Sequence, residues 1–125
     1  MTNIKEFHLY YDSTIEPFTS ITGSIEYILR KLHKLSNKGY KIKIIDTAGW
    51  TNDMLFEIYM SVVQLAIRRK FRLRKVFGTA REGGKYFGKE VASLLVYEND
   101  QLVDVYPKIE KGRLITIEDY LKSII

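Results

Sequence analysis

The sequence predicts a single α/β domain, residues 1–125, with a mixed central sheet and helices on both faces. Segments rich in β-branched and aromatic residues alternate with segments whose apolar residues recur at helical spacing, in the order β-α-β-α-β-β-α. The last two strand-like segments are separated by a short polar turn, which indicates an antiparallel hairpin. With 46% hydrophobic and 28% charged residues, the chain also has an ordinary globular composition.

The first strand is expected at residues 7–11, and a helix follows it. Apolar side chains recur at helical spacing from Ile21 to Leu35, which predicts one helix across this range. Gly23, with Glu26 three residues later, is a candidate start for that helix. Gly39 is the expected residue at its C-terminal end.

The second strand, Ile42 to Ile45, is expected to be buried, and a longer helix follows it. Asn52 or Asp53 is expected to cap this helix, which runs to about Lys70. A helix that is apolar on two sides is either well buried or part of a subunit interface, so burial and homodimerisation both remain open. Two apolar stripes lie along it: Leu55, Tyr59, Val62 and Ala66 form the first, and Phe56, Met60, Val63 and Ile67 form the second.

The second half of the chain contains the hairpin and a last helix. One further short strand near Val76 is an alternative to a simple connection, and a glycine-containing loop follows at 78–88. Strands at 92–97 and 102–106 flank a turn at 99–100 and form the expected antiparallel hairpin. Thr116, with Asp119 at the third position, predicts the start of the last helix.

Residue types that are absent or scarce exclude several chemistries. Without cysteine the chain forms no disulfide, thiolate nucleophile, zinc–cysteine site or iron–sulfur cluster. The two histidines, His8 and His33, are assigned to a strand and to a helix surface. Neither a signal peptide nor an apolar run long enough to span a membrane is recognisable in the sequence. We therefore expect a cytoplasmic protein with no membrane partner and no cofactor.

The positive charge of the chain is concentrated in one short segment. The formal net charge is +5, and residues 68–75 contain six basic residues and no acidic residue. Such a cluster can neutralise phosphates, and Phe71 offers a stacking face, which predicts a surface for nucleic acid or an acidic protein. The structural alternative is a helix end whose cations complement the dipole, followed by an edge strand protected by charge. The six basic residues are Arg68, Arg69, Lys70, Arg72, Arg74 and Lys75.

The glycine-containing loop is a second candidate anion site. Glycines allow backbone amides to approach an anion, and neighbouring cations add positive charge. The alternative is a solvated loop without a ligand. The cations of this candidate are Arg81, Lys85 and Lys89, and its glycines are Gly83, Gly84 and Gly88.

Two aspartates form a candidate metal site. Asp12 and Asp46 each follow a predicted parallel strand, and ligands of open α/β sheets bind at the carboxyl ends of strands. If the strands are neighbours, the two carboxylates could hold a magnesium ion. The alternative is a turn or helix-capping role. The stretch from Asp46 to Gly49 resembles the Asp-x-x-Gly motif of GTPases, but the phosphate-binding loop of such enzymes is missing.

The stretch from Lys85 to Val103, KYFGKEVASLLVYENDQLV, resembles the C-terminal half of a thioredoxin. That family has a helix end with tyrosine and glycine, a cis-proline step into an apolar strand, and a second antiparallel strand. Here Ala92 stands in place of the cis-proline, so a trans peptide bond is expected. The paired cysteines are missing from Thr14 to Ser20, where the family carries them. The resemblance therefore implies a thioredoxin-like fold without the redox activity.

A fold supports many functions, so the function has to be inferred from the candidate sites. The first hypothesis is a non-catalytic binding or assembly module whose basic surface contacts nucleic acid or an acidic partner. The alternative hypothesis is a metal-dependent enzyme that acts on a phosphate-containing substrate through Asp12 and Asp46. The surroundings of the two carboxylates discriminate between these hypotheses.

Overall fold

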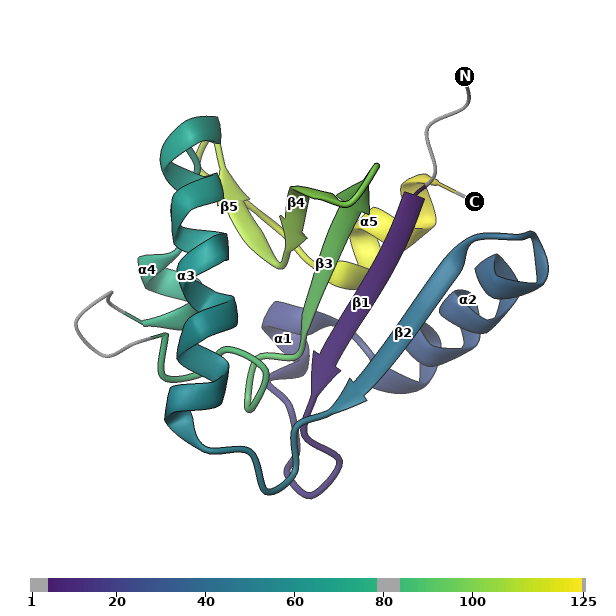
Figure 1. The fold of residues 1–125 in the computed structure, drawn as a ribbon, viewed down its shortest axis with the longest axis horizontal. Helices are drawn as coiled ribbons and strands as arrows, with labels where there is room; N and C mark the ends of the chain where they lie inside the picture. Colours follow the sequence, from purple (N-terminus) through teal and green to yellow (C-terminus); the bar gives the residue numbers. More distant parts are fainter. Residues whose placement is uncertain (1–4, 79–83, 125) are drawn as a thin grey trace.

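The computed structural model describes residues 5–78 and 84–124, which form a mixed α/β fold around a four-stranded sheet (Figure 1). The strand order is β2-β1-β3-β4. β1 (Lys5–Tyr11) pairs in parallel with β2 (Lys41–Asp46) and antiparallel with β3 (Ser93–Glu98). β3 in turn pairs antiparallel with β4 (Gln101–Tyr106). The mixed sheet and its hairpin are therefore confirmed.

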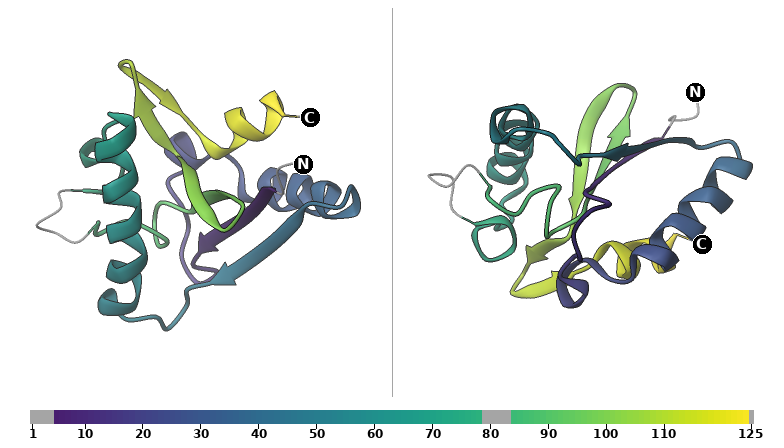
Figure 2. Two further views of the ribbon diagram at one scale, coloured as in Figure 1. Left: turned by 45° about the horizontal axis from the view of Figure 1, so that its top comes forward. Right: turned by 90° about the horizontal axis from the view of Figure 1, so that it is seen from below.

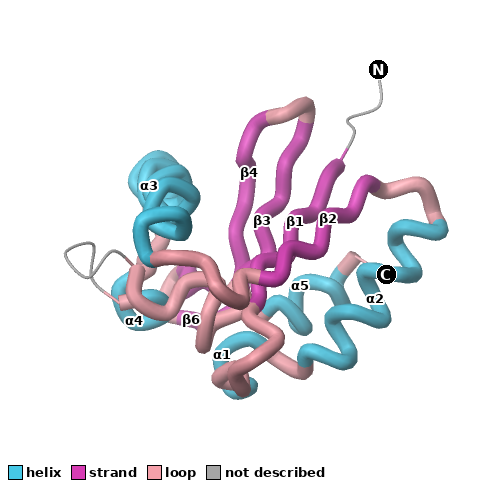
Figure 3. Tube along the Cα trace, turned by 60° about the horizontal axis from the view of Figure 1, so that its bottom comes forward, coloured by secondary structure: helices cyan, strands magenta, loops and turns pink. Residues whose placement is uncertain are grey.

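Helices cover both faces of the sheet (Figure 3). α2 (Ile25–Asn37) and α5 (Ile117–Ser123) lie on one face, and α3 (Asn52–Arg69) lies on the other. Side chains of a strand alternate between the faces, so β1 sends Phe7 and Leu9 toward α2 and α5 and Tyr10 toward α3. Among the helices that the structure describes, none has both the length and the apolar character needed to cross a membrane.

Hydroxyl side chains cap the three longer helices. Ser24 accepts a hydrogen bond from the backbone N–H of Tyr27 at the start of α2, and Thr51 accepts one from Met54 at the start of α3. The caps proposed at Gly23 and at Asn52 or Asp53 are thus each displaced by one or two residues. The capping box of Thr116 and Asp119 at the start of α5 is confirmed.

Three local expectations are corrected. The single helix expected from Ile21 to Leu35 is divided into α1 (Thr19–Thr22) and α2, because Gly23 has a φ of +93°. Val76 belongs to a short helix, α4 (Arg74–Phe77), and to no strand. β2 is less buried than expected, with Ile44 48% exposed, because β2 is an edge strand that pairs only with β1.

A second, two-stranded sheet was not expected from the sequence. β5 (Lys108–Glu110) and β6 (Arg113–Ile115) follow the cis peptide bond between Tyr106 and Pro107 and form a hairpin (Figure 2). Its turn, Lys111-Gly112, has positive φ angles at both residues, as tight hairpin turns require. The hairpin lies beside the segment that follows α3, where the Arg72 N–H donates to the Ile109 carbonyl at 3.1 Å. The described chain has no other cis bond, so the peptide before Ala92 is trans.

Candidate polyanion-binding site

The first part of the basic segment forms the end of α3. Arg68 and Arg69 are exposed in the last helical turn, where cations interact favourably with the helix dipole. Lys70 then adopts a left-handed conformation, with φ +60°, and its N–H donates to the Ala66 carbonyl. Arg68 and Arg69 therefore fit the structural alternative, a helix end whose cations complement the dipole. Neither residue lines the groove described below.

The residues after Lys70 divide into buried apolar and exposed basic side chains. Phe71 and Leu73 are buried in the core, while Arg72, Arg74 and Lys75 are exposed. The expectation that Phe71 offers a stacking face is wrong. Its side chain is only 6% exposed, and the Lys108 ammonium lies 5.3 Å from its ring centre.

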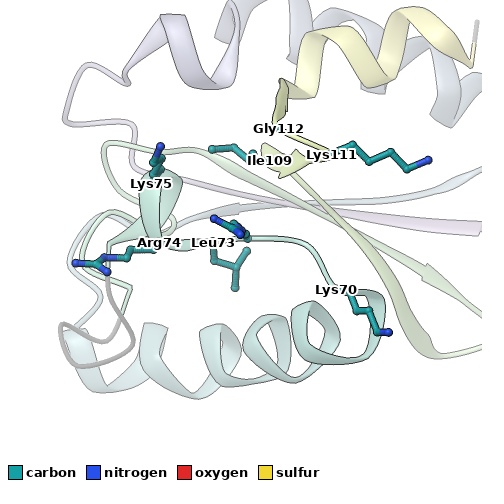
Figure 4. Close-up of a pocket in the computed structure, with 8 residues that line it drawn as sticks. Lys70, Leu73, Arg74, Lys75, Ile109, Lys111 and Gly112 are labelled. Atoms are coloured by element: carbon teal, nitrogen blue, oxygen red, sulfur yellow. The ribbon is translucent and has the colours of Figure 1, made fainter.

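A groove of about 1080 Å³ lies between this segment and the β5–β6 turn, and we call it the basic groove. Its walls come from the segment after α3, from α4 and from the hairpin (Figure 4). Five of its lining residues are cations, and none of the five forms an ion pair with any residue in 5–78 or 84–124. The lining residues are Lys70, Arg72, Leu73, Arg74, Lys75, Ile109, Lys111 and Gly112.

Sequence analysis missed the hairpin side of the basic groove. Lys111, Ile109 and Gly112 are far from residues 68–75 in the chain, and no charge cluster marks them. The signal that indicates them is the Lys111-Gly112 turn, a residue pair suited to positive φ that lies between Ile109 and Leu114 and is typical of a hairpin. The spatial approach of the hairpin to Arg72 has no local signature in the sequence.

A buried lysine joins β4 to the hairpin. Lys108 is 6% exposed, and its ammonium lies 2.7 Å from the Asp104 carboxylate and 3.2 Å from the Glu110 carboxylate. The Tyr106 hydroxyl donates to Asp104 at 2.7 Å, and burial together with this hydrogen bond raises the pKa of Tyr106. Because two carboxylates neutralise Lys108, the network positions β5 beside the basic groove without adding free positive charge to it.

Neither of the described cations of the glycine-containing loop, Lys85 and Lys89, lines the basic groove. Lys85 is exposed and its ammonium lies 5.5 Å from the Tyr86 ring centre, while Lys89 contacts Asp12. Arg81 and Gly83 lie outside the described residues. Gly84 and Gly88 pack closely against the side chains of α3, where a Cβ at Gly84 would approach the Tyr59 ring to 2.6 Å. These two glycines therefore have a packing role.

Asp12 and Asp46 lie at the carboxyl ends of neighbouring strands, and both are occupied by protein contacts. The Thr14 hydroxyl and N–H, and the Lys89 ammonium, donate to Asp12. The Ser13 hydroxyl and N–H, and the Ala48 N–H, donate to Asp46. Hydrogen bonds, first from Thr14 and from Ser13 respectively, lower the pKa of each carboxyl. Both groups are therefore ionised at neutral pH and hold the loops that follow their strands.

The environment of the two aspartates offers little to a metal ion. Within the described parts of the chain, no group of three or more histidine, cysteine, aspartate or glutamate side chains is close enough to hold one. His8 lies in β1 and bonds to Glu6, and His33 is exposed on α2, as expected. Magnesium binding by Asp12 and Asp46 stays a prediction. Among the described residues, no third carboxylate or histidine joins the two aspartates in a possible metal site.

Comparison of the chain with known protein families, curated protein sequences and solved structures gives no match. The function is therefore inferred from the geometry and chemistry of the sites.

Proposed function

We propose that this protein is a non-catalytic binding module that holds nucleic acid by its phosphates in the basic groove. One observation carries the proposal: five cations line the groove, and no carboxylate of the described chain pairs with them. Lys34 and Lys38 on α2 are also exposed without an ion pair, so the distinguishing feature of the groove is that five such cations line one cavity. Clustered cations without counter-charges attract a polyanion, because binding releases the ions condensed on its phosphates.

The lining of the basic groove favours phosphate contacts over base recognition. Its apolar residues are the aliphatic Leu73 and Ile109, and among the described residues that line it none has an aromatic side chain on which a base would stack. The neighbouring ring of Phe71 is buried beneath Lys108. Cations that contact phosphates position a nucleic acid without reading its sequence. We therefore expect binding with little sequence preference.

The fold proposal is a cysteine-free, thioredoxin-like domain. The longer elements follow the order β1-α2-β2-α3-β3-β4-α5, with α1, α4 and the β5–β6 hairpin inserted, and this order and the strand order β2-β1-β3-β4 support it. Ala92 precedes β3 and lines a cavity of about 270 Å³ together with Tyr11 and Asp12 from the end of β1. Since no thiol is present anywhere in the chain, thiol–disulfide exchange is excluded for this domain. A binding role is consistent with such a fold.

The alternative, a metal-dependent enzyme on a phosphate-containing substrate, is less well supported. Such an enzyme needs carboxylate oxygens that are free to coordinate a cation. The oxygens of Asp12 and Asp46 accept hydrogen bonds from their own loops, and the Lys89 ammonium places a positive charge beside Asp12. These contacts favour a structural role for the two aspartates.

The proposal is tested by fluorescence anisotropy with labelled duplex DNA, single-stranded DNA and RNA of mixed sequence. The groove variant Arg72→Gln/Arg74→Gln/Lys75→Gln removes three charges from exposed positions, so the fold should be retained. The control variant Lys34→Gln/Lys38→Gln/Arg69→Gln removes the same number of exposed charges outside the basic groove. At low salt we expect the groove variant to lose roughly tenfold or more in affinity, while the control stays close to the wild type.

Two results would contradict nucleic-acid binding in the basic groove. One is equal loss of affinity in the groove and control variants, which would indicate attraction to net charge alone. The other is the absence of binding to any nucleic acid at low salt. A polyglutamate probe is measured in parallel. Binding of this probe alone, with loss in the groove variant, would replace nucleic acid by an acidic protein partner.

A further inference from the structure

The second apolar stripe of α3 is only partly covered by the rest of the described molecule. The first stripe, Leu55, Tyr59, Val62 and Ala66, is buried against the sheet. The second stripe consists of Phe56, Met60, Val63 and Ile67. Its two ends are exposed, with Phe56 at 43% and Ile67 at 73%, and its two central residues are half-buried. A row of four apolar side chains on one helix face is a typical contact surface.

Charged residues of opposite sign flank the two ends of this stripe. Asp53 and Glu57 lie near the start of α3, and Arg68 lies in its last turn. Their spacing places them in one row beside the stripe, since residues four, seven and eleven apart share a helix face. All three are exposed, and none forms an ion pair within the described chain. The helix face thus has an acidic end, an apolar middle and a basic end.

We propose that this face of α3 binds the same face of a second copy of the chain, with the two helices antiparallel. A two-fold axis between Met60 and Val63 places each of these residues opposite the other in the partner copy. Phe56 then lies opposite the second copy's Ile67, so the apolar stripes cover each other. Such an interface is isologous, because every contact occurs twice.

The charges select this orientation and this occupant. In the antiparallel arrangement, Arg68 of each copy meets Asp53 and Glu57 of the other. In a parallel arrangement, a two-fold axis along the helices places the two charged rows on opposite sides of the helix pair, so Arg68 gains no acidic partner. A different protein would need an apolar helix with the reverse order of charges. A second copy of this chain presents that order when it lies antiparallel to the first. The small contact area places the dimer among weak assemblies.

The dimer also has a consequence for the arrangement of the basic grooves. Each groove begins at Lys70, immediately after the C-terminal end of α3. With the two-fold axis between Met60 and Val63, antiparallel pairing separates the two Lys70 residues by roughly 25 Å along the helices. Arg74 lies closer to the stripe, because it lines a cavity of about 360 Å³ together with Val63 and Ile67, so its charge opposes dimerisation and salt should screen this effect.

Sedimentation-velocity measurements over a wide range of protein concentration test this proposal. The wild-type mass should move from 14.7 kDa toward twice that value as concentration rises. Met60→Glu places a charge beside the two-fold axis and should leave only monomer. Met54→Glu is the matched control, because Met54 is 47% exposed on the same helix but outside the stripe. Ile67→Glu repeats the test at a side chain that is 73% exposed and contributes little to the core, so this variant should still fold.

Charge reversal tests the orientation. Glu57→Lys should raise the dissociation constant of the dimer roughly fivefold, because it places like charges at two symmetric contacts. Adding Arg68→Glu to the same chain should recover part of the lost affinity, since the reversed pair then meets in the antiparallel dimer while Asp53 faces a like charge. A monomer at all concentrations, or a dimer that Met60→Glu and Ile67→Glu leave unchanged, would overturn the proposal. Failure of Arg68→Glu to rescue Glu57→Lys would overturn the antiparallel arrangement.

Discussion

The Lys89 ammonium lies 3.0 Å from the Asp12 carboxylate, although the two residues are 77 positions apart in the chain. Lys89 also donates to the Thr47 carbonyl at 2.6 Å. One side chain therefore ties the loop before β3 to the ends of both β1 and β2. The Asp12 side chain is buried and that of Lys89 is largely covered, so this ion pair has a structural role that a surface pair lacks.

Replacing Lys89 by methionine is expected to lower the free energy of unfolding by about 2 kcal/mol, because it leaves a buried carboxylate without its cation. Lys122→Met is a matched control, since Lys122 pairs with Glu118 at a similar distance of 2.9 Å but is exposed. The control should lose much less stability. Urea denaturation of the three proteins measures both effects, and equal losses would show that the Lys89 contact is unimportant.

The stability of the protein should fall as the pH drops below the ordinary aspartate value. Hydrogen bonds from Thr14, assisted by Lys89, hold the pKa of Asp12 below 3.8 in the folded chain. The unfolded chain then binds a proton at a pH where the folded chain does not, so the stabilisation is complete above pH 3.8 and disappears as the pH falls through the folded value. Asp12→Asn should lower stability at neutral pH and make its decline in acid shallower. Urea unfolding at a series of pH values measures this, and parallel curves for both proteins would refute it.

Gly23 and Gly39 provide a test of close packing and backbone strain together. Both have positive φ, +93° and +96°, so an alanine is strained at either position, and at Gly23 the extended ψ of −176° adds to this strain. A Cβ at Gly23 would approach the Glu118 Cβ to 2.6 Å, whereas a Cβ at Gly39 meets nothing within 4 Å. We expect Gly23→Ala to cost roughly 1 to 2 kcal/mol more than Gly39→Ala in thermal or urea unfolding. Equal costs would show that Glu118 moves away freely.

Much of the fold could be predicted because its determinants are local. The hairpin is encoded by two apolar strands around a polar turn, and the start of α5 by Thr116 and Asp119. The exposure of Ile44 could not be predicted, because it depends on which strand lies at the sheet edge. The division of the first helix at Gly23 could not be predicted either, because the sequence is equally compatible with this glycine at the start of a single helix.

The candidate site could be predicted only on one of its sides. Arg72, Arg74 and Lys75 were found from charge clustering, which is visible in the sequence. Lys111 was missed because the β5–β6 hairpin brings it to the groove through tertiary packing. Phe71 was misassigned for the same reason, since its burial depends on contacts with Lys108 and the core rather than on its neighbours in the chain.

The salt dependence of nucleic-acid binding tests the central claim most directly. Each phosphate contact on duplex DNA contributes about −0.9 to the slope of log K against log salt, so five groove cations predict a slope of about −4.5. The variant Arg72→Gln/Arg74→Gln/Lys75→Gln should be flatter by roughly two to three units, and Lys34→Gln/Lys38→Gln/Arg69→Gln should keep the wild-type slope. Identical slopes for the groove variant and the wild type would contradict phosphate binding in the basic groove.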